Sequence, residues 1–234
     1  MPAARKVVTR SPKRTVGLIN CRWFQNQPIE HESRLEKHFV YRALLCPGLS
    51  KIQHQPFRLE LQRSGKYYTP DFLLFFSDGS HIVVEVKRSE KVKPLKDRFC
   101  EISERLAERN LPFFVLHQGQ IEGDLRASRA ALIRRYAMLS MSPETVEHAV
   151  AFVALHPQGV SIGKLTAALK LSEPQLYRLL ARRDIAVGAR LALSDSDLVF
   201  PIPKDTSHAS HQFGSWFGAA PWNPYARVRP DTGG

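Results

Sequence analysis

The chain has 234 residues, an apolar content of 43% and a formal net charge of +12. This size suits one large domain or two small ones. The positive charge favours a polyanionic partner, nucleic acid first and an acidic membrane surface second. Three widely spaced cysteines without a CxxC pair argue against a zinc site or a disulfide framework. No apolar run reaches transmembrane length, and no signal segment follows the basic N-terminus, so we expect a cytoplasmic protein without membrane contact.

Residues 1–20 are predicted to form a flexible basic arm, because residues 1–14 carry five Arg or Lys side chains and no acid. The arm could contact phosphates or simply be solvated. A helix is expected over 31–45, where apolar side chains recur at helical spacing before Pro47-Gly48 ends it. Glu36 lies at the edge of its apolar face.

The segment from Tyr68 to Lys87 is the most informative in the chain. A half-buried strand is expected over 57–61, and two apolar strands follow, over 72–76 and 81–87. Asp71 begins the first of these two strands. Glu85 and Lys87 lie two residues apart on the second and therefore share one face.

A hairpin would bring Asp71 close to Glu85 and Lys87. Two neighbouring carboxylates repel each other and attract a hard divalent cation, Mg²⁺ or Mn²⁺. Such an ion can activate water against a phosphodiester, and the lysine can stabilise the transition state. The same residues could also be charges on a solvated sheet face. Two features favour the nuclease interpretation: Glu85 and Lys87 interrupt a strongly apolar strand, and the acid Glu36 lies upstream.

The following segments complete a nuclease domain over residues 21–140. A helix is predicted over 91–109 and a buried strand over 111–116, which implies a parallel neighbour. The order helix, three strands, helix, strand predicts an α/β fold with a restriction-endonuclease-like mixed sheet flanked by helices. A further helix over 124–139 carries Arg126 and Arg129, which are candidate DNA contacts.

Residues 141–202 are predicted to form a winged-helix domain. Helices are expected over 142–155, 161–169 and 173–183, and strands over 190–193 and 198–200. The third helix carries Arg178, Arg182 and Arg183. These arginines suggest a recognition helix for DNA, but one basic helix is weak support, so we favour protein docking slightly.

Residues 203–234 are rich in proline, glycine and small residues, and we expect a disordered tail. Its spaced aromatic residues could anchor a partner or pack back on the chain itself: Phe213, Trp216, Phe217, Trp222 and Tyr225.

Residues 30–200 resemble the TnsA endonuclease family, the DNA-cutting subunits of heteromeric transposases. The resemblance lies in four motifs: Ser33-Arg34-Leu35-Glu36, Gln55-Pro56, Tyr68-Thr69-Pro70-Asp71-Phe72 and Glu85-Val86-Lys87. It implies that Glu36, Asp71 and Glu85 are ligands of Mg²⁺ and that Lys87 is the catalytic lysine. Gln55 joins the candidate DNA contacts.

The resemblance also implies a role. The protein would cleave the non-transferred 5′ strand at transposon ends on double-stranded DNA, in a prokaryotic nucleoid. A TnsB-like DDE transposase would cut the 3′ ends, and a TnsC-like ATPase would link the complex to target selection. The alternatives are a stand-alone restriction, repair or junction-resolving nuclease, a catalytically silent DNA-binding assembly factor, and a basic transcription regulator that uses the winged helix.

Overall fold

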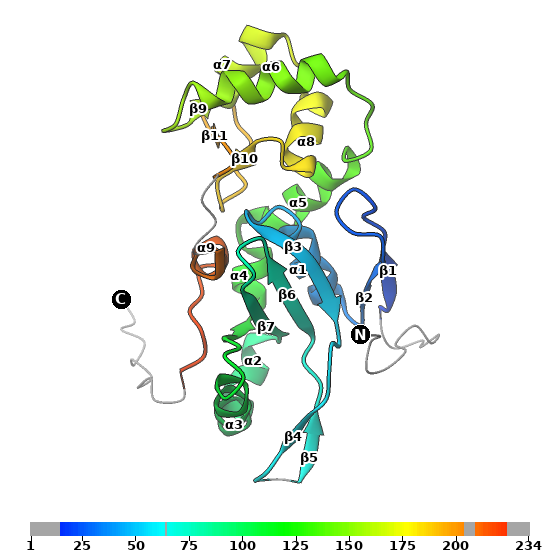
Figure 1. Cartoon of the computed structure of the whole chain (residues 1–234), viewed down its shortest axis with the longest axis vertical. Helices are drawn as coiled ribbons and strands as arrows, with labels where there is room; N and C mark the ends of the chain where they lie inside the picture. The colour runs from blue at the N-terminus through cyan, green and yellow to red at the C-terminus, as the bar shows by residue number, and fades with distance from the viewer. Residues whose placement is uncertain (1–14, 64, 204–208, 224–234) are drawn as a thin grey trace.

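The computed structural model describes residues 15–63, 65–203 and 209–223 (Figure 1). The molecule is elongated, with a helical module at one end, a central sheet and a projecting hairpin at the other end. None of the helices in these residues is both long and apolar enough to cross a membrane.

The central sheet has four strands in the order β3 (Leu49–His54), β6 (Phe72–Phe76), β7 (His81–Val86) and β8 (Phe113–Leu116). β6 is antiparallel to both of its neighbours, whereas β7 and β8 are parallel. The predicted parallel crossover is therefore confirmed. Strand β3 was not predicted, because its buried positions do not alternate regularly and its register shifts early in the strand.

Helices cover both faces of this mixed sheet. Val84 and Phe114 face the larger hydrophobic cluster, which includes α1 (Arg34–Ala43). Val83 and Phe113, one position earlier on each strand, face a second cluster with α3 (Lys96–Ala107). This alternation is the period-two geometry of a strand buried on both sides.

The predicted helix over 91–109 is divided into three short elements. α2 (Ser89–Val92) leads through the 3₁₀ turn η1 (Lys93–Leu95) into α3. Pro94 lies in η1, where its missing N–H and its ring interrupt regular helical hydrogen bonding.

The predicted helix over 124–139 is present but shorter, as α5 (Arg126–Arg135). A separate helix that was not predicted, α4 (Gln118–Glu122), and the 3₁₀ turn η2 (Gly123–Leu125) precede it. Asp124 and Leu125 have φ values of 53° and 59°, so the chain turns sharply between the two helices.

Two small hairpins flank the sheet. β1 (Gly17–Ile19) pairs with β2 (Ile29–His31), and β4 (Leu59–Leu61) pairs with β5 (Lys66–Tyr68). The expected arm over 1–20 is therefore too long, because residues 17–19 are held in a strand. Residues 1–14 lie outside the described part of the chain.

The helical module contains α6 (Pro143–Ala154), β9 (Val160–Ser161), α7 (Ile162–Leu169), α8 (Glu173–Arg182), β10 (Ala186–Val187) and β11 (Leu198–Phe200). Its three strands form a sheet in the order β10-β11-β9. The predicted helix positions are confirmed, but the predicted strand over 190–193 is wrong. Val187 pairs with Val199 instead, and Leu191 has a φ of 49°, which a strand does not allow.

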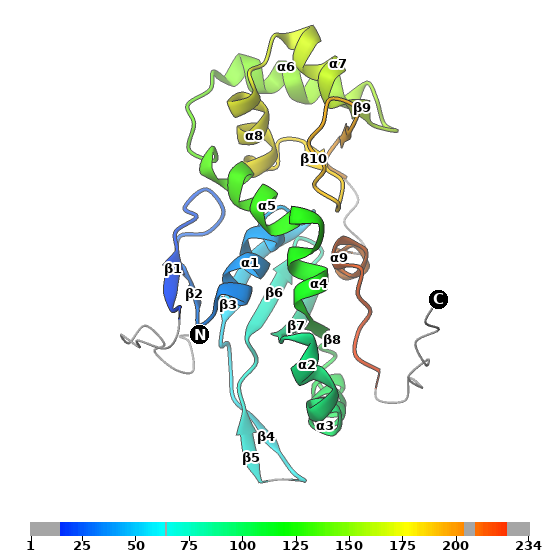
Figure 2. The ribbon, with the colours of Figure 1, turned by 180° about the vertical axis from the view of Figure 1, so that it is seen from behind.

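The two modules share one hydrophobic cluster, and α5 lies between α1 and α8 (Figure 2). Arg183 ends α8 in a left-handed conformation, and its guanidinium donates hydrogen bonds to the carbonyl oxygens of Cys46 and Leu49. The helical module is therefore joined to the domain of the central sheet by specific polar contacts as well as by apolar packing.

The expectation of a disordered tail is wrong for residues 209–223. α9 (Ala209–Phe217) buries Phe213, Trp216 and Phe217 at spacings of three and four residues, the face that a helix presents to a core. Phe213 lies 5.1 Å from the ring of Phe114. Residues 204–208 and 224–234, including Tyr225, lie outside the described residues.

The tail then follows strand β8, which is the edge strand of the central sheet. The backbone N–H of Trp222 donates to the carbonyl oxygen of Phe113 at 2.6 Å, and the Trp222 ring lies 5.3 Å from Phe99. The tail thereby covers part of an edge that would otherwise expose unpaired backbone groups.

Candidate active site

The hairpin of β6 and β7 brings Asp71, Glu85 and Lys87 together, as the period-two pattern predicted. The Lys87 ammonium nitrogen lies 2.6 Å from Glu85 Oε1 and 3.3 Å from Asp71 Oδ2. The backbone N–H of Val86 donates to Asp71 Oδ2 at 2.8 Å, which fixes the orientation of this carboxylate. Lys87 therefore lies between two carboxylates at the end of the strand.

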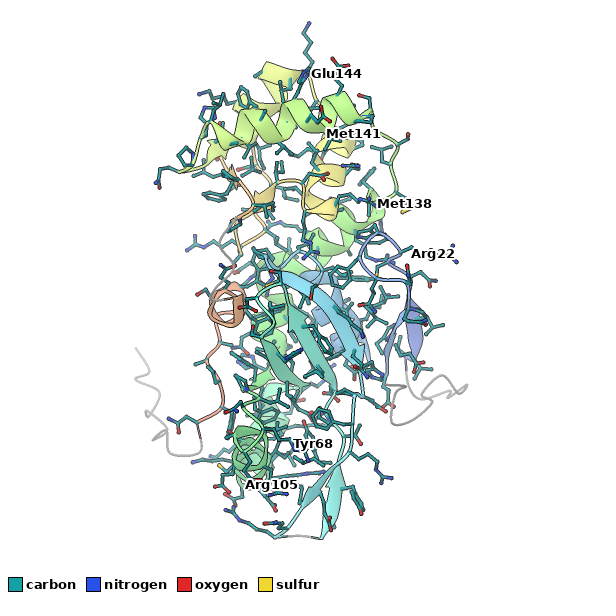
Figure 3. All side chains as sticks on the ribbon, in the orientation of Figure 1. Arg22, Tyr68, Arg105, Met138, Met141 and Glu144 are labelled. Carbon is teal, nitrogen blue, oxygen red and sulfur yellow. The ribbon has the colours of Figure 1, made fainter. Side chains whose placement is uncertain are left out.

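Tyr68 is a fourth member of this group, and sequence reasoning did not assign it a role. Its hydroxyl donates to Glu85 Oε2 at 2.6 Å, and its side chain is buried where the projecting hairpin joins the domain (Figure 3). Glu85 is therefore held between the Tyr68 hydroxyl and the Lys87 ammonium. Burial along β5 does not alternate, because Lys66 and Tyr67 are both exposed and only Tyr68 is buried, so no sequence pattern distinguished Tyr68.

Burial and mutual charge shift the protonation of these groups. Burial and the neighbouring charge of Glu85 raise the pKa of Asp71 well above its usual range, although Lys87 opposes the shift. Burial alone would lower the pKa of Lys87, but the charges of Asp71 and Glu85 outweigh it and raise that pKa. The single ammonium of Lys87 therefore does not offset both the burial of Asp71 and its repulsion by Glu85.

Glu36 is buried near the site but is turned toward its own helix start. Its carboxylate accepts hydrogen bonds from the Ser33 hydroxyl at 2.8 Å and from the Glu32 backbone N–H at 2.7 Å. The His54 imidazole lies 3.7 Å away. Burial would raise the pKa of Glu36, but these neighbours lower it overall.

A pocket of about 310 Å³ opens onto the Asp71–Glu85–Lys87 group. Glu32 and Gln55 also line this pocket, and the Gln55 amide donates to Glu32 Oε1 at 3.0 Å. Sequence reasoning placed Gln55 near the substrate but did not single out Glu32. Arg98, another lining residue that it missed, places its guanidinium 5.9 Å from the Tyr68 ring.

Within the described residues, no group of three or more His, Cys, Asp or Glu side chains is arranged to hold a metal ion. The three-carboxylate ligand set implied by the family resemblance is therefore not assembled here, because Glu36 is bonded to its own helix start. Asp71 and Glu85 nevertheless fit Mg²⁺, which commonly uses one or two protein carboxylates together with water and substrate phosphates.

Most of the arginines predicted to contact DNA have partners within the protein. Arg126 donates a hydrogen bond to the Asp124 carboxylate and Arg129 donates one to the Asp124 carbonyl oxygen, so both stabilise the turn before α5. Arg178 pairs with Asp184 at the end of α8.

Arg183 is likewise directed onto the nuclease-type domain, so it is not available to DNA. Arg182 remains exposed on the third helix, and its contact with DNA stays a prediction.

The mixed sheet and the grouped acids and lysine define a nuclease-type domain. Residues 47–118 match the family described as TnsA-like endonuclease N terminal. The match confirms the predicted relation to the TnsA endonuclease family and supports a nuclease related to the Tn7 transposase subunit. It contains Asp71, Glu85 and Lys87, whereas Glu36 and the helical module lie outside it. A search of curated proteins found no match.

Proposed function

We propose that this chain is the DNA endonuclease subunit of a heteromeric transposase and that it cuts the non-transferred 5′ strand at transposon ends. The single observation that carries the proposal is the Asp71–Glu85–Lys87 group, which lies inside the segment matched to the TnsA-like endonuclease domain. A TnsB-like DDE transposase would cut the other strand, and a TnsC-like ATPase would couple the pair to target selection.

Asp71 and Glu85 are the residues that would hold Mg²⁺, with Mn²⁺ as a substitute. When bound, the ion would polarise the phosphodiester and lower the pKa of a coordinated water. Lys87 places positive charge where the phosphate becomes more negative during cleavage. The Tyr68 hydroxyl orients Glu85 within the pocket.

The helical module has the helix and strand order of a winged helix, and we propose that it docks a protein rather than reads a DNA sequence. Internal ion pairs and hydrogen bonds engage Arg178 and Arg183 of the third helix and its cap. A recognition helix would instead keep such side chains free for base edges.

A strand-specific cleavage assay on a duplex that carries a transposon end tests the function. The chain is incubated with Mg²⁺, Mn²⁺ or Ca²⁺, alone and with a TnsB-like transposase and a TnsC-like ATPase. We expect cleavage at the 5′ strand with Mg²⁺ or Mn²⁺, little turnover with Ca²⁺ and none in EDTA, because the looser coordination of Ca²⁺ positions water poorly.

The matched variants for this assay are Asp71→Ala and Asp78→Ala. Asp78 lies in the exposed turn of the same hairpin, so its removal should leave cleavage unchanged. Cleavage by Asp71→Ala at the wild-type rate would overturn the site, and absence of wild-type cleavage in every mixture would overturn the function. Cleavage of any duplex without partners would indicate a stand-alone nuclease instead.

A further inference from the structure

We call the pocket beside the Asp71–Glu85–Lys87 group the catalytic pocket. The chain leaves it at Lys87 and returns to it at Leu95, Arg98 and Phe99, which also line it. The intervening segment passes through α2, η1 and the start of α3. We use the name basic ridge for its five exposed cationic residues: Arg88, Lys91, Lys93, Lys96 and Arg98.

The basic ridge carries unbalanced positive charge. None of its five members has an ion-pair partner in the part of the chain that the structure describes. Two acids, Glu90 and Asp97, lie among them, so the segment 88–98 has a net charge of +3 from five cations and two acids. This differs from Arg126 and Arg178, whose charges are used inside the protein.

Arg98 joins two hollows of the surface. It lines the catalytic pocket with Asp71 and Glu85. It also lines a second pocket of about 320 Å³, where the cations Arg63 and Lys66 of the projecting hairpin outnumber, together with Arg98, the acids Asp97 and Glu101. A continuous anionic chain could therefore pass from the catalytic group over Arg98 toward the hairpin.

We propose that the basic ridge binds the sugar–phosphate backbone of the DNA strand that enters the catalytic pocket, with Arg98 at the junction. This inference rests on the proposed nuclease function. Phosphate contacts of this kind fix the register of a duplex without reading its sequence. The ridge thereby places the DNA contact on the segment next to the catalytic lysine and not on α5 or α8.

The chemistry of the ridge favours nucleic acid over an acidic protein. Protein interfaces need buried apolar or aromatic anchors at their centre. The two apolar side chains of the segment, Val92 and Leu95, pack inward against the cluster beneath α3. The side chains that the ridge exposes to solvent are mainly cationic, and such a surface suits the phosphate backbone of a nucleic acid.

Salt-dependent binding of a fluorescent duplex in Ca²⁺ tests the ridge. The variant is Lys93→Gln/Lys96→Gln, and the matched control is Lys51→Gln/Arg109→Gln, which removes the same charge from exposed positions outside the ridge. Each lost phosphate contact should lower the log–log salt slope by about 0.9, so the ridge pair should lower it by about 1.8. The control pair should leave the slope near that of the wild type.

Two outcomes overturn the ridge. One is a wild-type salt slope in the ridge variant, which would indicate that the ridge binds an acidic protein instead of DNA. The other is an equal change of slope in both variants, which would indicate that DNA responds to the overall positive charge of the protein and not to the ridge. Circular dichroism and thermal melting verify that both variants are folded.

The cleavage assay separates this inference from the proposed function. If the wild type cleaves DNA but the ridge variant keeps the wild-type salt slope, the proposal about the ridge is wrong and the proposed nuclease function is unaffected. If the ridge variant has a lower salt slope while the wild type never cleaves DNA, the ridge binds phosphates but the proposed nuclease function fails.

Discussion

Arg42 and Trp216, which are 174 residues apart in the sequence, each donate a hydrogen bond to the backbone carbonyl oxygen of the other. The Arg42 guanidinium donates to the Trp216 carbonyl oxygen at 2.8 Å, and the Trp216 indole N–H donates to the Arg42 carbonyl oxygen at 3.2 Å. Arg42 is fully buried, and burial with the nearby charge of Arg126 lowers its pKa to about 10. Helix α9 therefore supplies an acceptor that a buried charge needs.

This relationship predicts that the tail stabilises the isolated protein. Trp216→Ala should cost about 3–5 kcal/mol in the free energy of unfolding, because it removes a buried ring and disturbs the Arg42 contact. For a chain of this size each kcal/mol corresponds to roughly 2–4 °C in melting temperature. Thermal melting of the purified chain measures the effect.

Leu155→Ala is the control, because the Leu155 side chain is 78% exposed and should contribute little. Deletion of residues 203–234 should lower the melting temperature at least as much as Trp216→Ala. Unchanged melting of both variants, together with weaker assembly with a transposase or ATPase, would restore the interpretation of the tail as a docking segment.

Asp71→Asn should abolish cleavage and raise the melting temperature at neutral pH. The raised pKa means that the folded chain binds a proton at Asp71 more tightly than the unfolded chain does. Stability is therefore lost as pH rises from the ordinary Asp pKa of about 3.9 toward the raised value. Asparagine resembles the neutral form of aspartate and does not ionise, so the Asp71→Asn variant should not lose stability in this pH range.

The melting difference between Asp71→Asn and the wild type should consequently grow as the pH rises from about 4 to neutrality. Asp78→Asn, in the exposed turn, should show no such trend. A variant that is less stable than the wild type at neutral pH would contradict the raised pKa.

Lys87→Ala should reduce cleavage by about a hundredfold or more, because it removes a charge that stabilises the transition state. It should also destabilise the fold without divalent ions, since Asp71 and Glu85 would lose their shared ammonium. Added Mg²⁺ should raise the melting temperature of this variant more than that of the wild type.

Lys51→Ala, at an exposed position of β3, is the control for charge alone. If Mg²⁺ fails to stabilise Lys87→Ala while it still stabilises the wild type, Lys87 would be required for metal binding and its assigned role would be wrong.

Tyr68→Phe should lower the cleavage rate while leaving DNA affinity unchanged. The substitution removes the hydroxyl that donates to Glu85 Oε2, and a hydrogen bond to a charged group contributes about 1.5–3 kcal/mol. Tyr67→Phe provides the matched control, because the neighbouring Tyr67 side chain is 56% exposed. Equal rates for the two variants would remove Tyr68 as a positioning residue.

The sequence by itself determined the central hairpin and its charged residues. Period-two alternation places Glu85 and Lys87 on one face, and the short turn at Asp78 and Gly79 returns the chain beside Asp71. These are relations over about fifteen residues, so local geometry is sufficient to predict them. The same reasoning found the helices of the second module from their caps and spacing.

Only the tertiary structure decided the partners that come from distant segments. Arg98 reaches the pocket because α3 packs beneath the sheet, and Arg183 turns inward because α8 meets the nuclease-type domain. The tail looked disordered by composition, yet Phe213 is buried against Phe114 of β8 and Trp216 against Arg42 of α1, both far away in the sequence. Composition and periodicity describe a segment on its own, whereas burial depends on the surface that another segment offers.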